Sequence, residues 1–319
     1  MLAHRLAFVG LSTSVFRPAI LRVANHPWAR RAVTGTRPGR RVAFRFVAGE
    51  TLAEAMAAAR ELHSRGLRTM LDHLGEHVDT PQHALAAREA YLSALEAGAD
   101  AEDVDAAISV KLTQLGLDVS VDACWANFEP IVKSAGEKDR LVMIDMESHG
   151  YVDRTLEVFA RAYERSQHVG VAIQSYLRRS EADVFALPEG CRVRLVKGAY
   201  LEPEDVVFTR KRDVDASYAR LFATLLAREH PVDVATHDPA LIEGVRTRVD
   251  AFEYGWSRVE FQMLYGVRRD LQTRLAGDGY PVRVYIPYGT EWYPYLTRRM
   301  AERPANVWFF VSNLVRTSG

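Results

Sequence analysis

Short runs of apolar and β-branched residues alternate along the chain with longer segments in which apolar residues recur every three or four positions. The longer pattern is typical of helices with one buried face, and it is clear in residues 151–164 and 216–229. Strand and helix alternating eight times predicts an α/β fold, a parallel barrel of the (β/α)8 TIM type. The predicted strands are Leu67–Leu71, Ala107–Leu112, Leu141–Met146, Val169–Ser175, Val193–Lys197, Val232–Thr236, Val259–Met263 and Val282–Ile286.

A doubly wound dinucleotide-binding sheet is the structural alternative. It would carry a G-x-G-x-x-G sequence after its first strand, and neither that motif nor a P-loop occurs in the chain. We therefore predict one barrel over residues 51–319. An N-terminal helical arm, residues 1–50, precedes it and contains a loop at Thr34–Arg41.

Composition narrows the range of functions. Of the 319 residues, 48% are apolar, and 41 Lys and Arg balance 41 Asp and Glu. A neutral chain is not expected to bind nucleic acid, which requires a basic surface. Cys124 and Cys191 lie far apart in the sequence and indicate neither a disulfide framework nor a metal site. We expect no metal, and a reducing cytoplasm fits this use of cysteine.

The N-terminal segment is rich in arginine, and the first acidic residue is Glu50. Three interpretations stay open: helices packed on the main domain, a basic segment resting on the inner face of a membrane, and a mitochondrial transit peptide. No stretch has the roughly 18 uninterrupted apolar residues of a membrane-spanning helix. The expected location is cytoplasmic, with peripheral membrane contact as the alternative.

Polar side chains stand at the ends of nearly all the predicted strands. In a (β/α)8 barrel the carboxyl ends of the strands meet at one face, which carries the active site. Each residue alone would suit a salt bridge in a loop, but their convergence indicates a ligand site. The residues are Ser109, Lys111, Asp145, Met146, Glu147, Gln174, Arg194, Lys197, Thr236, His237, Asp238, Glu260, Gln262 and Tyr285.

Two cations belong to the fifth predicted strand. Alternation places Arg194 and Lys197 on opposite faces, so both reach the site only if the strand kinks, and Gly198 would permit that. Two cations beside a glycine suit a bound anion, such as a pyrophosphate or a negatively charged reduced flavin.

The last predicted helix follows Thr290 as a candidate N-cap, with Glu291 in its first turn. Tyr295, Arg298, Arg299 and Glu302 share one face of this helix because of their spacing. Paired arginines would clamp a carboxylate through their forked donors. A solvated face held by an ion pair between Arg298 and Glu302 is equally compatible with the spacing.

The chain carries seven motifs in order: Ile108–Lys111, Ile144–Glu147, Arg194–Tyr200, Ala235–His237, Glu260–Gly266, Tyr285–Gly289 and Tyr295–Glu302. Together they resemble the proline dehydrogenase family, in its monofunctional bacterial form, over roughly residues 45–315. The resemblance implies a distorted (β/α)8 barrel whose final helix lies over the barrel mouth. It also implies non-covalent FAD and oxidation of L-proline to 1-pyrroline-5-carboxylate by hydride transfer to flavin N5.

The resemblance assigns the contacts of the substrate carboxylate. Arg298 and Arg299 should pair with it, and Lys111 should contact it as well. Glu302 should orient the two arginines. Glu76 should close the site by pairing with Arg298.

The resemblance also assigns the ring contacts and the cofactor contacts. Tyr285 and Tyr200 should wall the proline ring, with Leu264 on its apolar side. Asp145 should hold the surrounding polar network, so Asp145, Arg194 and Tyr285 are the expected catalytic residues. The residues expected to line FAD are Met146, Gln174, Arg194, Lys197, Gly198, Ala199, Thr236, His237 and Gln262.

The resemblance implies two partners beyond L-proline: a quinone that accepts electrons and a separate pyrroline-5-carboxylate dehydrogenase that receives the product. No residue stands out as a general base, so the amine should lose its proton to solvent and activity should rise with pH. Three alternatives are weighed against this function. They are a hydroxyproline or related imino-acid dehydrogenase, a Schiff-base lyase using Lys111 or Lys197, and a non-catalytic proline-binding regulator.

Overall fold

The computed structural model describes residues 26, 31, 33–75, 77–78, 80–101, 103–251 and 255–302, the last five of these without their side chains. The chain divides into two compact units. Residues 48–289 form the larger unit. The smaller unit combines residues up to 47 with those from 290 onward. The predicted division at residue 50 stays a prediction.

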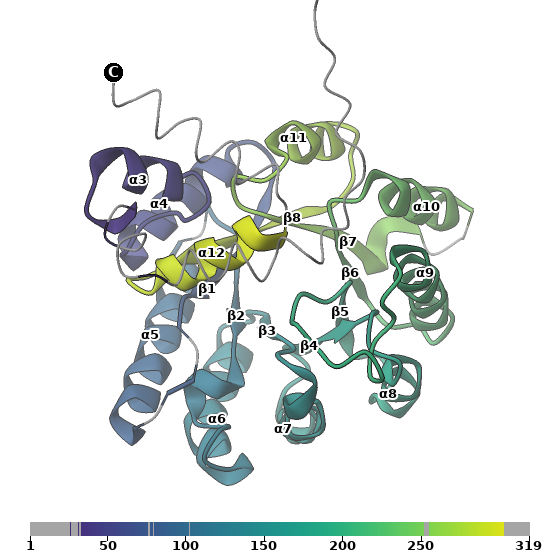
Figure 1. Cartoon of the computed structure of the whole chain (residues 1–319), viewed down its shortest axis with the longest axis horizontal. Helices are drawn as coiled ribbons and strands as arrows, with labels where there is room; N and C mark the ends of the chain where they lie inside the picture. Colours follow the sequence, from purple (N-terminus) through teal and green to yellow (C-terminus); the bar gives the residue numbers. More distant parts are fainter. Residues whose placement is uncertain are drawn as a thin grey trace, which may run out of the picture. The chain divides into compact units, whose positions relative to one another are not determined.

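The larger unit is a closed barrel of eight parallel strands in sequential order, as the alternating pattern predicts (Figure 1). Hydrogen bonds between β1 and β8 close it, with Met70 in register with Tyr285. Both faces of the strands are largely buried, one against the barrel interior and one against the helices. This explains why the strands appear in the sequence as nearly continuous apolar runs. The strands are β1 (Arg68–His73), β2 (Ala106–Val110), β3 (Val142–Ile144), β4 (Val169–Gln174), β5 (Arg192–Val196), β6 (Val232–Ala235), β7 (Val259–Leu264) and β8 (Val282–Tyr288).

Helices surround the strands on the outside (Figure 1). The helix predicted at residues 151–164 is α7, and the one predicted at 216–229 is α9, which begins five residues earlier and ends before Glu229, whose φ is 62°. The helices are α4 (Leu52–His63), α5 (Pro81–Asp100), α6 (Val121–Glu137), α7 (Val152–Arg165), α8 (Ser180–Ala186), α9 (Lys211–Ala227), α10 (Pro239–Asp250) and α11 (Arg269–Gly277), with short turns η1 (Leu112–Leu115), η2 (His149–Tyr151) and η3 (Gly255–Arg258).

Two environments meet at the strands. Between strands and helices lies an apolar core that includes Phe128, Phe159 and Tyr218. Inside the barrel, charged side chains such as Arg194 and Arg283 are also buried. Burial of charge is costly unless partners and hydrogen bonds compensate it, so the barrel interior requires a complete polar network.

The smaller unit contains α3 (Arg37–Ala43) and α12 (Trp292–Glu302), with the rings of Phe44 and Trp292 in edge contact at 5.8 Å. The predicted loop at Thr34–Arg41 is wrong except at Gly35 and Thr36, because Thr34 is helical and α3 begins at Arg37. Thr36 caps α3 by accepting a hydrogen bond from the backbone of Gly39, and proline is tolerated in a first helical turn because its missing N–H has no partner there.

Two further expectations concern this unit. Because α12 begins at Trp292, Glu291 precedes the first turn rather than lying within it, which corrects the prediction.

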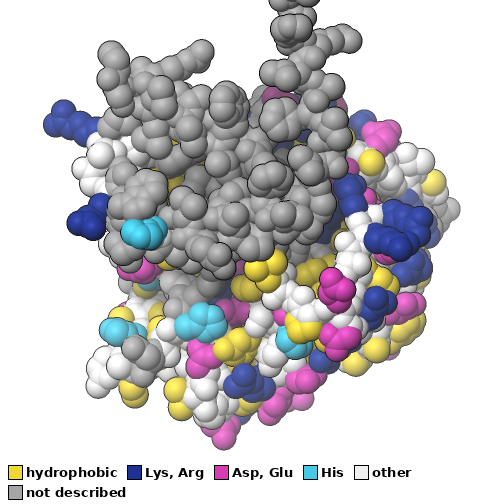
Figure 2. Space-filling model, viewed as in Figure 1, with side chains coloured by type: hydrophobic (Ala, Val, Ile, Leu, Met, Phe, Trp, Pro, Cys, Tyr) yellow, Lys and Arg dark blue, Asp and Glu magenta, His cyan; other side chains and the backbone are white. Residues whose placement is uncertain are grey.

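Most of the arginine-rich N-terminal segment lies outside the described residues. No helix in the described part of the chain is both long and apolar enough to span a bilayer. Acidic and basic side chains lie interspersed on the described part of the face in Figure 2.

Candidate active site

A cluster of polar side chains lies inside the barrel toward the carboxyl ends of its strands. Lys111 and Asp145 directly follow β2 and β3, whereas Arg194 and Tyr285 lie within β5 and β8. Ser109 of β2 completes the group. All five residues were predicted together as polar side chains at strand ends, and the structure brings them into hydrogen-bond contact.

Asp145 is the centre of the cluster. Its Oδ1 accepts hydrogen bonds from Ser109, at 2.8 Å, and from the guanidinium of Arg194. Its Oδ2 accepts one from the Tyr285 hydroxyl at 2.8 Å and lies 3.3 Å from the Lys111 ammonium. The carboxylate therefore joins side chains from β2, β5 and β8, which fixes their positions relative to one another.

Lys111 is held by a second carboxylate that the sequence interpretation missed. Its Nζ lies 2.8 Å from Oδ1 of Asp72, which is fully buried at the end of β1. A third acceptor, the Tyr285 hydroxyl, lies at 3.4 Å. Asp72 directly follows the predicted first strand. The strand-end criterion used for the other strands would therefore have found it.

Burial and neighbouring charges set the ionisation of the cluster. Burial opposes the charge on Asp145, but Lys111, Arg194 and the hydrogen bonds outweigh it and hold its pKa below the ordinary value. Burial dominates at Asp72 and raises its pKa in spite of Lys111. Burial disfavours the charge on Lys111, yet Asp72 and its other neighbours raise its pKa well above the usual range. Lys111 is therefore a fixed cation at neutral pH.

A series of hydrogen bonds supports Arg194 from the interior, and we call it the interior polar column: Arg283, Glu260, Gln262, Arg194 and Asp145. Arg194 Nε donates to Gln262 Oε1 at 2.6 Å, and Gln262 Nε2 donates to Glu260 Oε1 at 3.2 Å. Arg283 Nε donates to the same oxygen of Glu260 at 2.7 Å. The Gln262 amide has one possible orientation, because its oxygen must face a donor and its nitrogen an acceptor.

Glu260 does not lie where the sequence placed it. It is the second residue of β7 rather than a residue at the carboxyl end of the strand. There it pairs with Arg283 and, through Oε2, with Arg68 at 3.0 Å. Its role in this structure is to anchor the interior polar column.

The two cations of the fifth strand do not meet. Arg194 points into the barrel, whereas the Nζ of Lys197 lies 2.6 Å from Asp215 of α9 and 2.8 Å from Asp238, the N-cap of α10. The chain does turn at Gly198, whose φ of 109° favours glycine. An added Cβ there would stand 2.1 Å from the ring of Tyr176. Whether Lys197 lines a cofactor stays a prediction.

Of the other residues predicted to line FAD, Gln262 lies within β7, and the rest lie at or beyond the carboxyl ends of β3 to β6. Gln174 donates from Nε2 to the Met146 carbonyl at 3.2 Å, while its buried Oε1 accepts no hydrogen bond from the residues that the structure describes. His237 accepts a hydrogen bond through Nε2 from the Leu264 backbone at 3.1 Å, which places its ring proton on Nδ1. Thr236 is buried, whereas Ala199 and Tyr200 are half-buried in the segment after β5.

The predicted apolar wall of the substrate site stays a prediction, but two of its residues are adjacent in the barrel. Leu264 of β7 pairs directly with Tyr285 of β8, so the two predicted ring contacts are neighbours. Glu76 and the side chains of Arg298, Arg299 and Glu302 lie outside the described residues.

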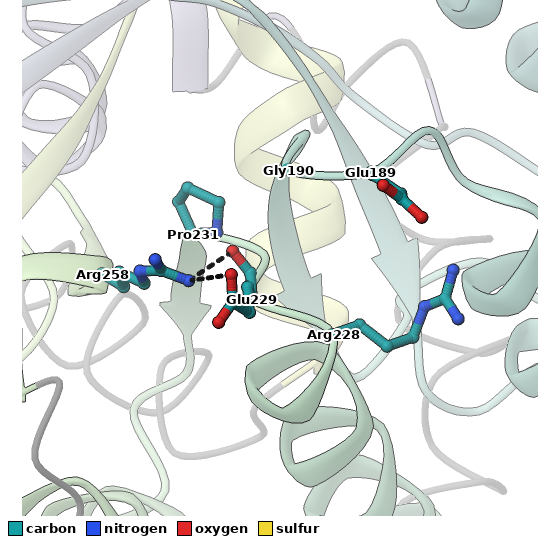
Figure 3. A pocket seen from close by; sticks show the side chains of 6 residues that line it. All are labelled: Glu189, Gly190, Arg228, Glu229, Pro231 and Arg258. Carbon is teal, nitrogen blue, oxygen red and sulfur yellow. Dashed lines mark hydrogen bonds and ion pairs between the residues drawn. The ribbon is translucent and has the colours of Figure 1, made fainter.

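A surface hollow of about 560 Å³ lies at the opposite end of the barrel (Figure 3). Its residues precede β5, β6 and β7 rather than follow them: Glu189, Gly190, Arg228, Glu229, Pro231 and Arg258. Arg258 and Glu229 are paired within it. Since the amino ends of barrel strands do not carry the catalytic residues in this fold, we place the active site at the interior cluster instead.

The lysine environments argue against a Schiff-base lyase. Such an enzyme requires a neutral amine as its nucleophile. Lys111 is instead a fixed cation between two carboxylates, and Lys197 is bound by Asp215 and Asp238.

A closed barrel with a charged cluster toward the carboxyl ends of its strands defines a (β/α)8-barrel enzyme. A family model for proline dehydrogenase matches residues 55–311. The chain is 39% identical over 308 residues to a proline dehydrogenase of Deinococcus radiodurans, covering 95% of this chain and 98% of that protein. It is 36% identical over 310 residues to proline dehydrogenase 2 of Bacillus subtilis, covering 97% and 98%.

The fold has a counterpart among solved structures. Proline utilization A (PutA) from Bdellovibrio bacteriovorus, inactivated by N-propargylglycine, matches with a TM-score of 0.77 at 24% identity, over 90% of this chain and 36% of that one. The chain described here belongs to the proline dehydrogenase family.

Proposed function

We propose that this enzyme oxidises L-proline to 1-pyrroline-5-carboxylate with non-covalently bound FAD. The observation that carries the proposal is the interior cluster. Two cations, Lys111 and Arg194, share the Asp145 carboxylate, and Tyr285 is fixed beside them. A small amino acid with a carboxylate fits cations of this kind, and family membership supports proline as the substrate.

The residues after β3 to β7 fit a flavin nucleotide. The unpartnered, buried Oε1 of Gln174 suits an N–H donor, which a flavin ring supplies. FAD, when bound, would supply the acceptor for the hydride that leaves C5 of proline. Met146, Gln174, Gln262, Thr236, His237 and the segment Lys197–Ala199 would hold it, with Arg194 beside the ring.

The side chains of the cluster orient the substrate and compensate its charge. Lys111, Arg298 and Arg299 bind the carboxylate in this proposal, and Glu302 orients the two arginines. Tyr285, Tyr200 and Leu264 confine the ring, which holds C5 in one position. A positive Arg194 stabilises negative charge that develops on the cofactor side. Glu76 pairs with Arg298 when the site closes, which excludes water.

Electrons then pass to a quinone, and the product passes to a separate pyrroline-5-carboxylate dehydrogenase. Contact of the basic N-terminal segment with the inner face of the membrane would bring the enzyme to its quinone. The amine loses its proton to solvent before oxidation, so kcat/KM rises from neutral to alkaline pH.

The visible spectrum of the purified protein, before and after anaerobic addition of L-proline, tests the proposal. We expect flavin bands that bleach with proline, and slower bleaching with 4-hydroxyproline because Tyr285 crowds the added hydroxyl. Arg298→Ala and Arg299→Ala should raise the KM for proline. A colourless protein that takes up no FAD and reduces no dye with proline would exclude this function.

A further inference from the structure

Asp72 is a buried carboxylate that the mechanism above does not use. It ends the interior face of β1 and is 0% exposed. Its Oδ1 lies 2.8 Å from the Lys111 ammonium, and its Oδ2 accepts no hydrogen bond from the described residues. Burial of a carboxylate oxygen without a hydrogen-bond partner lowers the stability of the folded protein. We therefore expect a carboxylate at this position to have a function.

The partners of Lys111 are not equivalent. An ammonium has three N–H donors, and here the acceptors are Asp72 at 2.8 Å, Asp145 at 3.3 Å and the Tyr285 hydroxyl at 3.4 Å. A bound carboxylate must replace one of them. Asp145 can leave Lys111 readily, because Arg194, Ser109 and Tyr285 still bind it. Among the described residues, Lys111 is the only donor that lies within hydrogen-bond distance of Asp72, and the Tyr285 hydroxyl is its other polar neighbour.

We propose that Asp72 is the positioning residue of the carboxylate-binding lysine: it holds Lys111 charged and in place while the substrate carboxylate takes the position of Asp145. This inference rests on the proposed function, in which Lys111 binds that carboxylate. Asp72 need not touch the substrate.

The surroundings of Asp72 leave Lys111 as its counter-ion. Among the described residues, the titratable groups facing it besides Lys111 are Tyr91 of α5, Asp145 after β3, and Tyr285 and Tyr288 of β8. His73, the next residue on β1, is kept neutral because burial lowers its pKa. Replacing Asp72 by asparagine would retain the shape and one acceptor oxygen, but would leave Lys111 with a single anionic neighbour. The lysine would then lose its proton at lower pH.

The first test compares Asp72→Asn with the native enzyme in steady-state kinetics from pH 7 to 9.5. We expect KM for proline to rise about tenfold at neutral pH and further as pH increases, with kcat changed less than threefold. Asp105→Asn is the matched control, because Asp105 pairs with Arg283 outside the substrate cluster. An equal effect of Asp72→Asn at every pH, or a loss confined to kcat, would overturn the proposal.

A double-mutant cycle with Lys111→Met separates an effect through the lysine from a general one. The readout is calorimetric binding of a five-membered-ring carboxylate that carries an ether oxygen in place of the amine. We expect Asp72→Asn to weaken binding in the native background and to add nothing in the Lys111→Met background. Additive losses would show that Asp72 acts independently of Lys111.

Two further measurements keep the outcome decisive. If Asp72→Asn does not fold, Asp145→Asn takes its place: the proposal expects it to bind the ring carboxylate better than Lys111→Met does, and equal losses would contradict it. The thermal midpoint of Asp72→Asn should also fall less steeply with rising alkaline pH than that of the native protein, because the folded variant no longer holds the Lys111 proton above the pKa of an unfolded lysine. This readout needs no substrate, so the proposal about Asp72 can fail or succeed apart from proline oxidation.

Discussion

Tyr285 on β8 donates a hydrogen bond of 2.8 Å to Asp145 at the end of β3, across the barrel interior. The hydroxyl is also 3.4 Å from the Lys111 ammonium, so it contacts both the cationic Lys111 and the anionic Asp145. Burial and the nearby Asp145 and Asp72 raise the pKa of Tyr285 well above its usual value, so the hydroxyl remains a donor throughout the neutral and alkaline range.

Tyr285→Phe should lower kcat/KM for proline by about 10- to 100-fold. A hydrogen bond to a charged group contributes about 1.5–3 kcal/mol, and each 1.4 kcal/mol corresponds to roughly a factor of ten. Steady-state kinetics would measure the loss. Tyr288→Phe is the control, since Tyr288 lies on the same strand and no hydrogen bond joins it to Asp145. Native activity in Tyr285→Phe would show that this contact is dispensable.

Arg194→Lys should reduce kcat by about 100-fold even though the charge is retained. A lysine cannot bind Ser109, Asp145 and Gln262 simultaneously with the fixed fork of a guanidinium. Single-turnover reduction of bound flavin by proline would measure this step. Arg192 lies on the same strand as Arg194 and pairs with Asp233 of β6; Arg192→Lys should leave the rate within threefold of native. Similar losses in both variants would mean that general destabilisation is responsible.

Gly198→Ala should destabilise the protein more than Gly66→Ala does. Both glycines have positive φ, 109° and 76°, which costs a residue with a Cβ roughly 1–2 kcal/mol. At Gly66 the added Cβ meets nothing within 4 Å, whereas at Gly198 it collides with the ring of Tyr176. Overpacking of this kind adds about 1–3 kcal/mol. Urea unfolding of the two variants isolates the collision, and equal midpoints would show that Tyr176 moves aside freely.

The two thiols should be unreactive in the folded enzyme. Burial raises the pKa of Cys124 and of Cys191 to about 12, and the thiolate is the reactive form. An aromatic disulfide reagent at pH 8 should label neither cysteine until denaturant is added. Rapid labelling of the native protein would contradict the burial described here.

The same thiols should make stability fall at alkaline pH. Their pKa in the folded state lies above the value of about 8.5 in an unfolded chain. Their contribution is therefore complete below about pH 8.5 and is lost as the pH rises toward 12. In urea titrations over this range, a variant with both cysteines replaced by alanine should lose less stability than the native protein.

The barrel could be predicted from the sequence because its signals are local. Eight apolar runs separated by helical patterns correspond one to one with β1–β8, and the strand-end rule located Lys111 and Asp145. Asp72 was missed although it follows Leu71 by a single position. The predicted strand ended at Leu71, the last apolar residue of its run, whereas the observed strand continues to His73.

Side-chain partners were harder to predict than strands. Sequence spacing places Arg194 and Lys197 on opposite faces, and they do separate, but Gly198 alone does not indicate that Asp215 and Asp238 bind Lys197. These acids belong to α9 and to the start of α10, so the contact depends on how helices pack around the barrel. The position of Glu260 depends likewise on Arg283, a residue from another strand.

The interior polar column limits how this protein can change in evolution. Glu260 accepts hydrogen bonds from both Arg283 and Gln262. Replacing Glu260 alone would therefore remove one counter-ion of Arg283 and the acceptor of the Gln262 amide. Unpaired buried charges are strongly destabilising, so a sequence that alters one position must alter its neighbours as well. Across related sequences these interior positions should therefore covary as one block, independently of the helices that surround them.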